Sequence, residues 1–334
     1  MNSREVREII ANLGDVTEKV ADKTVLVTGG AGFLGSWLCD ILVELNANVI
    51  CLDNLASGLE SNVSGLRDKD NFAFIRHDIT RPIFFDETLD VVLHLASRAS
   101  PFEFQQFPIQ ILKANTLGIW VALGIAKRHK ARFLYTSTSE IYGNATEIPT
   151  SEEYTGNVNP IGARSCYDEA KRCGESFVAA YRMEHGMDAR VARLFNTYGP
   201  RMRADDVYGR VVPRFIEQAL TNAPITVFGD GSQTRSFCYV TDQIEGLLRL
   251  AFLEGLDGKT VNIGNDEEIT IVALAEIIKK LTNSSSETKF EDLPKDDPLR
   301  RKPDISKAKE FLKWKPTVDL EKGLERTIQW FRVK

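Results

Sequence analysis

A chain of 334 residues is long enough for one large domain or two linked ones with an ample core. Its composition, 43% hydrophobic and 27% charged, is typical of a soluble globular protein. The formal net charge of −5 disfavours a general nucleic-acid binder, so any anionic ligand must be held by local arginines. The five cysteines have no metal-ligand spacing, which predicts reduced thiols, a cytoplasmic location and no metal site.

The first 22 residues predict a short helical arm rather than a targeting signal. Acidic and basic side chains are interspersed there, and Val6, Ile9, Ile10 and Leu13 recur at helical spacing. We expect this arm to pack on the body of the protein or on a partner subunit. No apolar run reaches the length of a membrane span, so no membrane association is expected.

From Thr24 onward, compact apolar strands alternate with helices, a pattern typical of a parallel sheet covered on both faces. We therefore predict a Rossmann-type, doubly wound α/β domain over residues 23–198. From about Gly199 shorter strands and more loops predict a smaller substrate-binding domain over 199–334, with parts of 236–265 completing the sheet. The expected strands are 24–28, 48–52, 72–76, 91–95, 132–135 and 189–194, with short ones at 225–228 and 260–263, and the expected helices include 33–45, 270–282, 305–312 and 319–332.

A dinucleotide site is predicted where the first strand ends. The strand runs directly into Gly29-Gly30-Ala31-Gly32-Phe33-Leu34-Gly35 and then into a helix, so the backbone and the helix N-terminus can approach a pyrophosphate. The glycines at 29, 32 and 35 follow GxxGxxG spacing rather than GxGxxG. The flanking strand and helix, and the acid that ends the next strand, support the prediction.

That acid, Asp53, indicates which dinucleotide binds. Its carboxylate can accept hydrogen bonds from both ribose hydroxyls of the adenosine and would repel a 2′-phosphate. No lysine or arginine follows at 54–58, so NAD is favoured over NADP. The alternative is that Asp53 only caps a turn. Asp78 and Ile79, after the third strand, would lie beside the adenine.

A second group of residues predicts acid–base chemistry. Tyr167 and Lys171 stand four residues apart, on one face of a helix. A close ammonium and the positive nicotinamide ring would stabilise the phenolate and lower the pKa of Tyr167. Tyr167 could then take a proton from a substrate hydroxyl while hydride leaves its carbon. The hydroxyl-rich segment 136–143 follows a strand, at the edge where open α/β sheets place their ligands.

Arginines provide the local positive charge that a diphosphate requires. Arg201, Arg203 and Arg210 cluster in one segment, and Arg235 and the pair Arg300–Arg301 follow. Guanidinium groups bind phosphate oxygens in a forked geometry. We expect Arg235 to lie closest to the diphosphate or to a substrate carboxylate.

Beyond these motifs, the chain resembles the extended short-chain dehydrogenases, and among them the UDP-glucuronate decarboxylases. The resemblance extends from Lys23 to Phe331. It implies NAD chemistry on a UDP-sugar, and a homodimer formed by a four-helix bundle. It is closest at 157–172 (NVNPIGARSCYDEAKR), 195–203 (FNTYGPRMR), 209–213 (GRVVP), 229–239 (GDGSQTRSFCY) and 296–305 (DDPLRRKPDI).

The resemblance also implies residue roles. Tyr167 would be the catalytic base and Lys171 its activator, Thr138 would hydrogen-bond the C4 hydroxyl of the sugar, and Glu140 would be a second acid–base group. Besides the glycines, Asp53, Asp78, Ile79 and the Tyr167–Lys171 pair, the NAD contacts would be Phe33, Leu34, Asn54, Leu95, Ser97 and Thr197. The UDP-sugar would contact Ser139, Asn196, Arg210, Arg235 and Arg301.

Residue 139 discriminates between reactions. Nucleotide-sugar 4,6-dehydratases resemble this family but carry Thr-Asp-Glu where this chain has Thr138-Ser139-Glu140. A serine is too weak an acid to protonate the departing C6 hydroxyl, which disfavours dehydration. Decarboxylation needs no such acid, because loss of CO2 from a 4-keto acid leaves an enolate that the carbonyl absorbs.

The predicted reaction is therefore oxidation of UDP-glucuronate at C4, loss of CO2 and re-reduction to UDP-xylose. A C4 epimerase is the nearest alternative, and an oxidative decarboxylase that releases NADH is another. From a different class, the chain could be a non-catalytic sensor of NAD or of a nucleotide-sugar.

Four departures from the family pattern leave the identity of the sugar open. Family members usually have proline at Arg98 and Ala163, tryptophan at Thr155, and no insertion of Val207-Tyr208. We expect Arg98 beside the sugar pocket and the insertion in a substrate loop.

Overall fold

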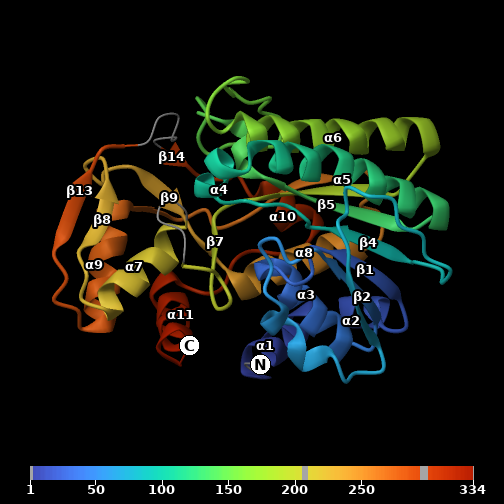
Figure 1. Cartoon of the computed structure of the whole chain (residues 1–334), viewed down its shortest axis with the longest axis horizontal. Helices are drawn as coiled ribbons and strands as arrows, with labels where there is room; N and C mark the ends of the chain where they lie inside the picture. The colour runs from blue at the N-terminus through green and yellow to red at the C-terminus, as the bar shows by residue number, and fades with distance from the viewer. Residues whose placement is uncertain (1–2, 205–209, 294–299, 334) are drawn as a thin grey trace.

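The computed structural model describes residues 3–204, 210–293 and 300–333, and a seven-stranded sheet forms its centre (Figure 1). The strand order is β11-β6-β5-β4-β1-β2-β3, and every neighbouring pair is parallel. This confirms the Rossmann-type, doubly wound sheet. Its strands are β1 (Thr24–Thr28), β2 (Asn48–Asp53), β3 (Phe72–Arg76), β4 (Val91–His94), β5 (Arg132–Thr138), β6 (Ala189–Leu194) and β11 (Thr260–Ile263).

One strand differs from expectation in a way that matters for the site. β5 runs to Thr138, whereas the sequence predicts its end at residue 135. The hydroxyl residues Thr136, Ser137 and Thr138 pair with the last three residues of β6. Because the neighbouring strand supplies the backbone hydrogen bonds, these polar residues stay in the ladder instead of forming a loop.

Helices cover both faces of the sheet (Figure 1). α3 (Phe33–Glu44) and α8 (Val240–Phe252) contact one face, and α5 (Pro108–His129) and α6 (Ser165–His185) contact the other. Nearly all of α8 is buried, since it lies between the sheet and the N-terminal helices. The two faces thus produce the two largest apolar clusters of the described chain.

The N-terminal arm packs on the body of the protein. It forms α1 (Ser3–Leu13) and α2 (Val16–Val20), which both contact α8. Val6, Ile9 and Leu13 of α1 are buried, as expected of the apolar face of an amphipathic helix.

By length and composition alone, α5 is long and apolar enough to cross a membrane. Core helices of soluble proteins meet the same criterion, and 44% of the most apolar window of α5 is buried inside the fold. Ile111, Ile119 and Leu123 lie on its buried side. Lys113 and Asn115 interrupt the apolar pattern, which is why no continuous run is visible in the sequence.

The smaller, C-terminal part of the fold lies at one end of the sheet (Figure 1). β11 returns from it to pair with β6. A three-stranded sheet of order β12-β9-β14 sets Arg301 opposite Arg235. The remaining elements are α4 (Pro101–Gln106), β7 (Thr197–Tyr198), α7 (Val211–Leu220), β8 (Ile225–Phe228), β9 (Thr234–Ser236), β10 (Cys238–Tyr239), β12 (Glu268–Thr270), α9 (Ile271–Thr282), β13 (Thr288–Glu291), β14 (Arg300–Arg301), α10 (Ser306–Phe311) and α11 (Leu320–Val333).

Candidate active site

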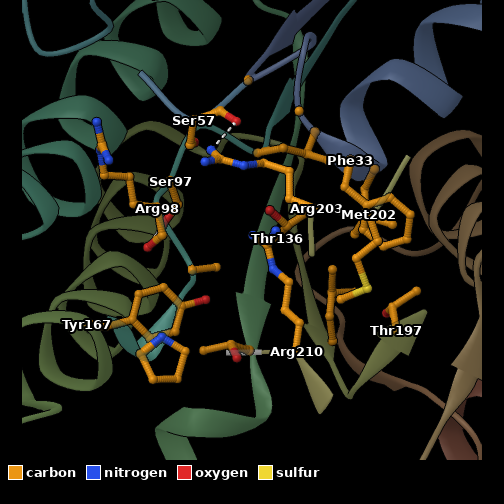
Figure 2. Close-up of a pocket in the computed structure, with 18 of the residues that line it drawn as sticks. Phe33, Ser57, Ser97, Arg98, Thr136, Tyr167, Thr197, Met202, Arg203 and Arg210 are labelled. Carbon is orange, nitrogen blue, oxygen red and sulfur yellow. Dashed lines mark hydrogen bonds between the residues drawn. The ribbon is translucent and has the colours of Figure 1, made fainter. Parts of the chain in front are cut away.

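The carboxyl ends of the parallel strands open into one cavity of about 620 Å³. Open α/β sheets bind their ligands at this edge, where the strand order reverses. The structure brings every predicted catalytic, cofactor and substrate residue into the wall of this one cavity. Figure 2 shows Tyr167 projecting into it from one side, with Thr197 and Met202 on the other.

The glycine-rich turn packs too closely against neighbouring backbone to accept side chains at Gly29 and Gly35. Gly29 has φ +73°, and a Cβ there would lie 2.8 Å from the Cα of Ala96. A Cβ on Gly35 would lie 2.1 Å from the carbonyl oxygen of Gly29. Gly32 is the N-cap of α3, so the free N–H groups of that helix face the cavity. The turn can therefore hold a pyrophosphate at the helix N-terminus.

Asp53 lies at the end of β2 in the same wall. Its carboxylate oxygens accept hydrogen bonds from the backbone N–H groups of Ala31 (3.0 Å) and Leu55 (2.8 Å). Asp53 therefore does cap the turn, but each oxygen keeps a second lone pair for a ribose hydroxyl. Burial raises the pKa of this carboxyl, and the backbone donors oppose the rise. The glycine cradle and this acid fit NAD.

A buried ammonium joins α6 to the end of β5. Lys171 is 3% exposed, and its Nζ donates a 2.8 Å hydrogen bond to the carbonyl oxygen of Thr136. Burial lowers the pKa of Lys171 to about 7, while the carboxylate of Glu175 acts in the opposite direction. Tyr167 lies one turn earlier on α6, and the side chain of Thr138, at the end of β5, acts to lower the pKa of its phenol.

The expected lowering of the Tyr167 pKa is wrong for the protein alone. Burial raises the pKa of this phenol, and the carboxylate of Glu140 raises it further. The ammonium of Lys171 is directed at Thr136 and stands 5.9 Å from the centre of the Tyr167 ring. The positive charge of bound NAD would favour the phenolate, so the activation expected from the sequence depends on the cofactor.

Glu140 is held between two arginines. Arg301 donates to its two carboxylate oxygens at 2.5 and 2.9 Å, and Arg164 also donates to it. Burial would raise the pKa of Glu140, but the two guanidiniums outweigh it and hold the pKa well below its usual range. Glu140 is thus ionised, and it can donate a proton only after it is protonated and released from an arginine.

Arg164 is a site residue that sequence reasoning missed. It precedes α6, lines the cavity, and lies 3.7 Å from the carboxylate of Asp168 as well as pairing with Glu140. Burial raises the pKa of Asp168 to about 8, and Glu140 adds to the rise. The position of Arg164, three residues before the tyrosine of YxxxK, was the available signal.

Behind the cavity, a second ion pair holds β5, β6 and α6 together. Ser137 donates a 2.6 Å hydrogen bond to Glu175, and Arg193 donates to both oxygens of the same carboxylate at 3.0 and 2.7 Å. These side chains are partly buried. The forked geometry orders the strand ends that carry Thr136 and Thr138.

The arginines divide into those inside the cavity and those directed elsewhere. Arg201 pairs with Asp40 of α3, although it also borders the cavity, and Arg300 pairs with Glu268 at the surface. The cavity wall includes Arg203, Arg210, Arg235 and Arg301.

The departures from the family pattern lie in three places. Arg98 borders the cavity, but its guanidinium pairs with Glu103 at 2.5 Å. Ala163 lines the cavity. Thr155 lies outside it, and its carbonyl oxygen accepts a hydrogen bond from the Arg172 guanidinium. Val207-Tyr208 lies outside the described residues.

The fold and this cavity define a dinucleotide-binding protein of the short-chain dehydrogenase type. The chain belongs to the NAD dependent epimerase/dehydratase family, whose model matches residues 25–264, and NAD is its cofactor. It is 49% identical to UDP-glucuronic acid decarboxylase 3 of Arabidopsis thaliana over 311 residues, which cover 93% of this chain and 89% of that one.

Solved structures agree with this assignment. An epimerase of Methanothermobacter thermautotrophicus has a TM-score of 0.88 at 32% identity, covering 96% of this chain and 95% of that one. The UDP-glucuronic acid 4-epimerase of Bacillus cereus, solved with UDP-glucuronic acid and NAD, has a TM-score of 0.82 at 29% identity, covering 93% and 99%.

We predict that Gly35→Ala weakens NAD binding at least tenfold. The added Cβ would collide with the Gly29 carbonyl and push α3 away from the turn that holds the pyrophosphate. Gly65→Ala is the matched control, because nothing lies within 4 Å of a Cβ at that position. Calorimetric titration with NAD measures both. Equal affinities in the two variants would contradict the assignment of this turn.

Proposed function

We propose that this chain converts UDP-glucuronate to UDP-xylose, with NAD returned to its starting state in each turnover. The observation that carries the proposal is Ser139, which lies between Thr138 and Glu140 and lines the same cavity as Tyr167. This site has the groups for oxidation at C4 and lacks at residue 139 the acid that dehydration requires. The identity to a decarboxylase over 93% of the chain supports the same reaction.

The residues divide the work as follows. The glycine turn and Asp53 would hold NAD, which would supply the acceptor for the C4 hydride and the means of returning it. Tyr167 takes the proton of the C4 hydroxyl, and Thr138, which favours the ionised phenol, helps it to do so. Once C4 is a ketone, the bond from C5 to the carboxylate breaks and CO2 leaves. The electron pair of that bond forms the enolate of the C4 ketone. C5 would then take up a proton that comes ultimately from solvent, the hydride would return to C4, and Tyr167 would give back its proton to the C4 oxygen.

Arg235 and Arg301 supply the charge for the anionic substrate. They are paired across β9 and β14, and each is less than 10% exposed. Arg301 already binds Glu140, so an incoming diphosphate or carboxylate would compete with Glu140 for this guanidinium. Such competition would release Glu140, which is the condition for its predicted acid–base role.

An epimerase is the second candidate, because the fold is also that of a solved UDP-glucuronic acid 4-epimerase. It would begin with the same oxidation, and the keto-sugar would then rotate and accept hydride on its other face. The product distinguishes the two reactions.

We expect the protein, given UDP-glucuronate and a catalytic amount of NAD, to form UDP-xylose without net NADH. Proton NMR identifies the product. Tyr167→Phe should lower kcat by about a thousandfold or more, since it removes the proton acceptor, while NAD still binds. UDP-galacturonate as product would make the protein an epimerase. Accumulating NADH would indicate an oxidative decarboxylase, and an intact substrate would favour a sensor.

The ion pair at Glu140 makes the rate sensitive to pH in a defined direction. In Arg164→Met one guanidinium is lost, so the pKa of Glu140 should rise by about one unit or more. If Glu140 must be ionised, activity falls as pH falls through its pKa, and the acid limb of kcat/KM should move to higher pH. Arg182→Met, whose guanidinium pairs with Asp257, is the control on the same helix. An unmoved limb would exclude this role of Arg164.

We also propose a homodimer that forms through α5 and α6. The two helices pack side by side and expose several large apolar side chains. A two-fold axis beside them would bury the same face of both copies. These side chains are Ile109, Leu112, Leu117 and Trp120 of α5 and Met183 of α6.

Light scattering after gel filtration should give about twice the 37.4 kDa chain mass. Trp120→Glu would put a charge into the apolar interface and should give monomers at micromolar concentration. Phe290→Glu is the control, because Phe290 is equally exposed, at 53%, but lies on β13. A monomeric unmutated protein would refute the dimer.

A cytoplasmic location is proposed on the state of the thiols. All five cysteines lie in the described part of the chain and are free, and four of them are buried. Free thiols are typical of reducing compartments.

A further inference from the structure

The segment from Gly199 to Arg203 crosses from β7 to the dinucleotide half of the cavity. The indole Nε1 of Trp37 donates a 3.2 Å hydrogen bond to the carbonyl oxygen of Pro200, which fixes the segment to α3. Arg201 pairs with Asp40 on the same helix, and its guanidinium lies 4.9 Å from the centre of the Trp37 ring. Both contacts join α3 to the segment that follows β7 in the sequence.

Arg203 extends this connection across the cavity. Its Nη1 donates a 3.0 Å hydrogen bond to the carbonyl oxygen of Ser57, as Figure 2 shows. Ser57 lies in the segment that follows Asp53, and a Cβ on the adjacent Gly58 would lie 2.9 Å from the Asp53 carboxylate. The guanidinium is therefore attached to the wall that holds the adenosine ribose.

The position of this charge has a physical consequence. The cavity wall at this end contains Phe33 and Gly32 at the N-terminus of α3, where the pyrophosphate binds. Arginine stays protonated at any physiological pH, so a permanent positive charge borders the path of a dinucleotide that carries two phosphate charges. A cofactor that leaves past residue 203 must break the Arg203–Ser57 hydrogen bond or pass alongside it.

We propose that Arg203 retains the cofactor, by closing the segment 199–203 onto Ser57 and so slowing the dissociation of NAD and NADH. For turnover, an inference that rests on the proposed function, retention matters because the hydride taken from one sugar must return to that same sugar. A cofactor that left between oxidation and re-reduction would abandon a 4-keto pentose.

The direct test needs no sugar. The protein is loaded with NADH and mixed with excess NAD, and the loss of bound NADH fluorescence gives the dissociation rate. Arg203→Met keeps the length of the side chain but has no donor, and we expect about tenfold faster dissociation, as for the loss of one charge-assisted hydrogen bond. Arg203→Lys can still donate to the Ser57 carbonyl and should recover part of the difference.

Two controls make the result specific. Arg182→Met removes an arginine of α6 that pairs with Asp257 and lies away from the cavity wall. This variant should release NADH at the unmutated rate. Circular dichroism and the melting temperature show whether Arg203→Met is folded, and Arg203→Lys replaces it if it is not. A rate within twofold of the unmutated protein would overturn the proposal. A second result would also overturn it. If the unmutated protein bound NADP more tightly than NAD, and Arg203→Met lost the NADP binding but kept the NAD binding, Arg203 would instead recognise the 2′-phosphate.

A second measurement follows the consequence in turnover. With UDP-glucuronate and NAD in excess over enzyme, Arg203→Met should accumulate NADH beyond the concentration of enzyme and release a 4-keto product, and the unmutated protein should not. If the unmutated protein leaves UDP-glucuronate intact, the proposed function fails, but the NADH dissociation rates still decide the role of Arg203. Faster dissociation in Arg203→Met without any leak of NADH would overturn the link to turnover.

Discussion

The hydrogen bond from the Lys171 ammonium to the Thr136 carbonyl is the interaction on which the site depends. It ties α6 to the end of β5, and so places Tyr167, one turn earlier, beside Thr138. A buried charge is costly unless it is hydrogen-bonded. The pKa of Lys171 is lowered to about 7 by burial, so the site contains a cation close to its neutral form. One turn later, Glu175 opposes this lowering and also binds Ser137, which lies next to Thr136.

The electrostatics of the cavity depend on pairs that can be exchanged. Glu140 joins Arg301 to Arg164, and Arg164 also approaches Asp168, so positive and negative groups alternate across the wall. One oxygen of Asp168 is buried and has no hydrogen-bond partner among the described residues. An anionic ligand that binds Arg301 or Arg164 would compete with Glu140 or Asp168 for that arginine. Because Glu140 and Arg164 each have two partners, the loss of one ion pair would affect the next.

Much of this was predictable, and the rest was not, for reasons visible in particular residues. The glycines at 29, 32 and 35 and the acid Asp53 are local signals, since the glycines directly follow β1 and Asp53 ends β2. The end of β5 is not local, because Thr136 to Thr138 remain in the sheet only through their pairing with β6. The bonds of Arg301 to Glu140 and of Arg203 to Ser57 join residues 161 and 146 positions apart. Residue types suggest such pairs, but only the fold decides which form.

The last strand of the sheet has a consequence for how this chain can be divided. β6 pairs with β5 on one side and with β11 on the other, and β11 begins only at Thr260. A fragment that stops near residue 198 would leave β6 as an exposed edge, and such an unpaired strand is a template for aggregation. Residues up to about 198 are therefore not expected to form an independently folding fragment. The strand that covers β6 comes from residues 260–263, so a chain that keeps β6 paired must extend at least that far.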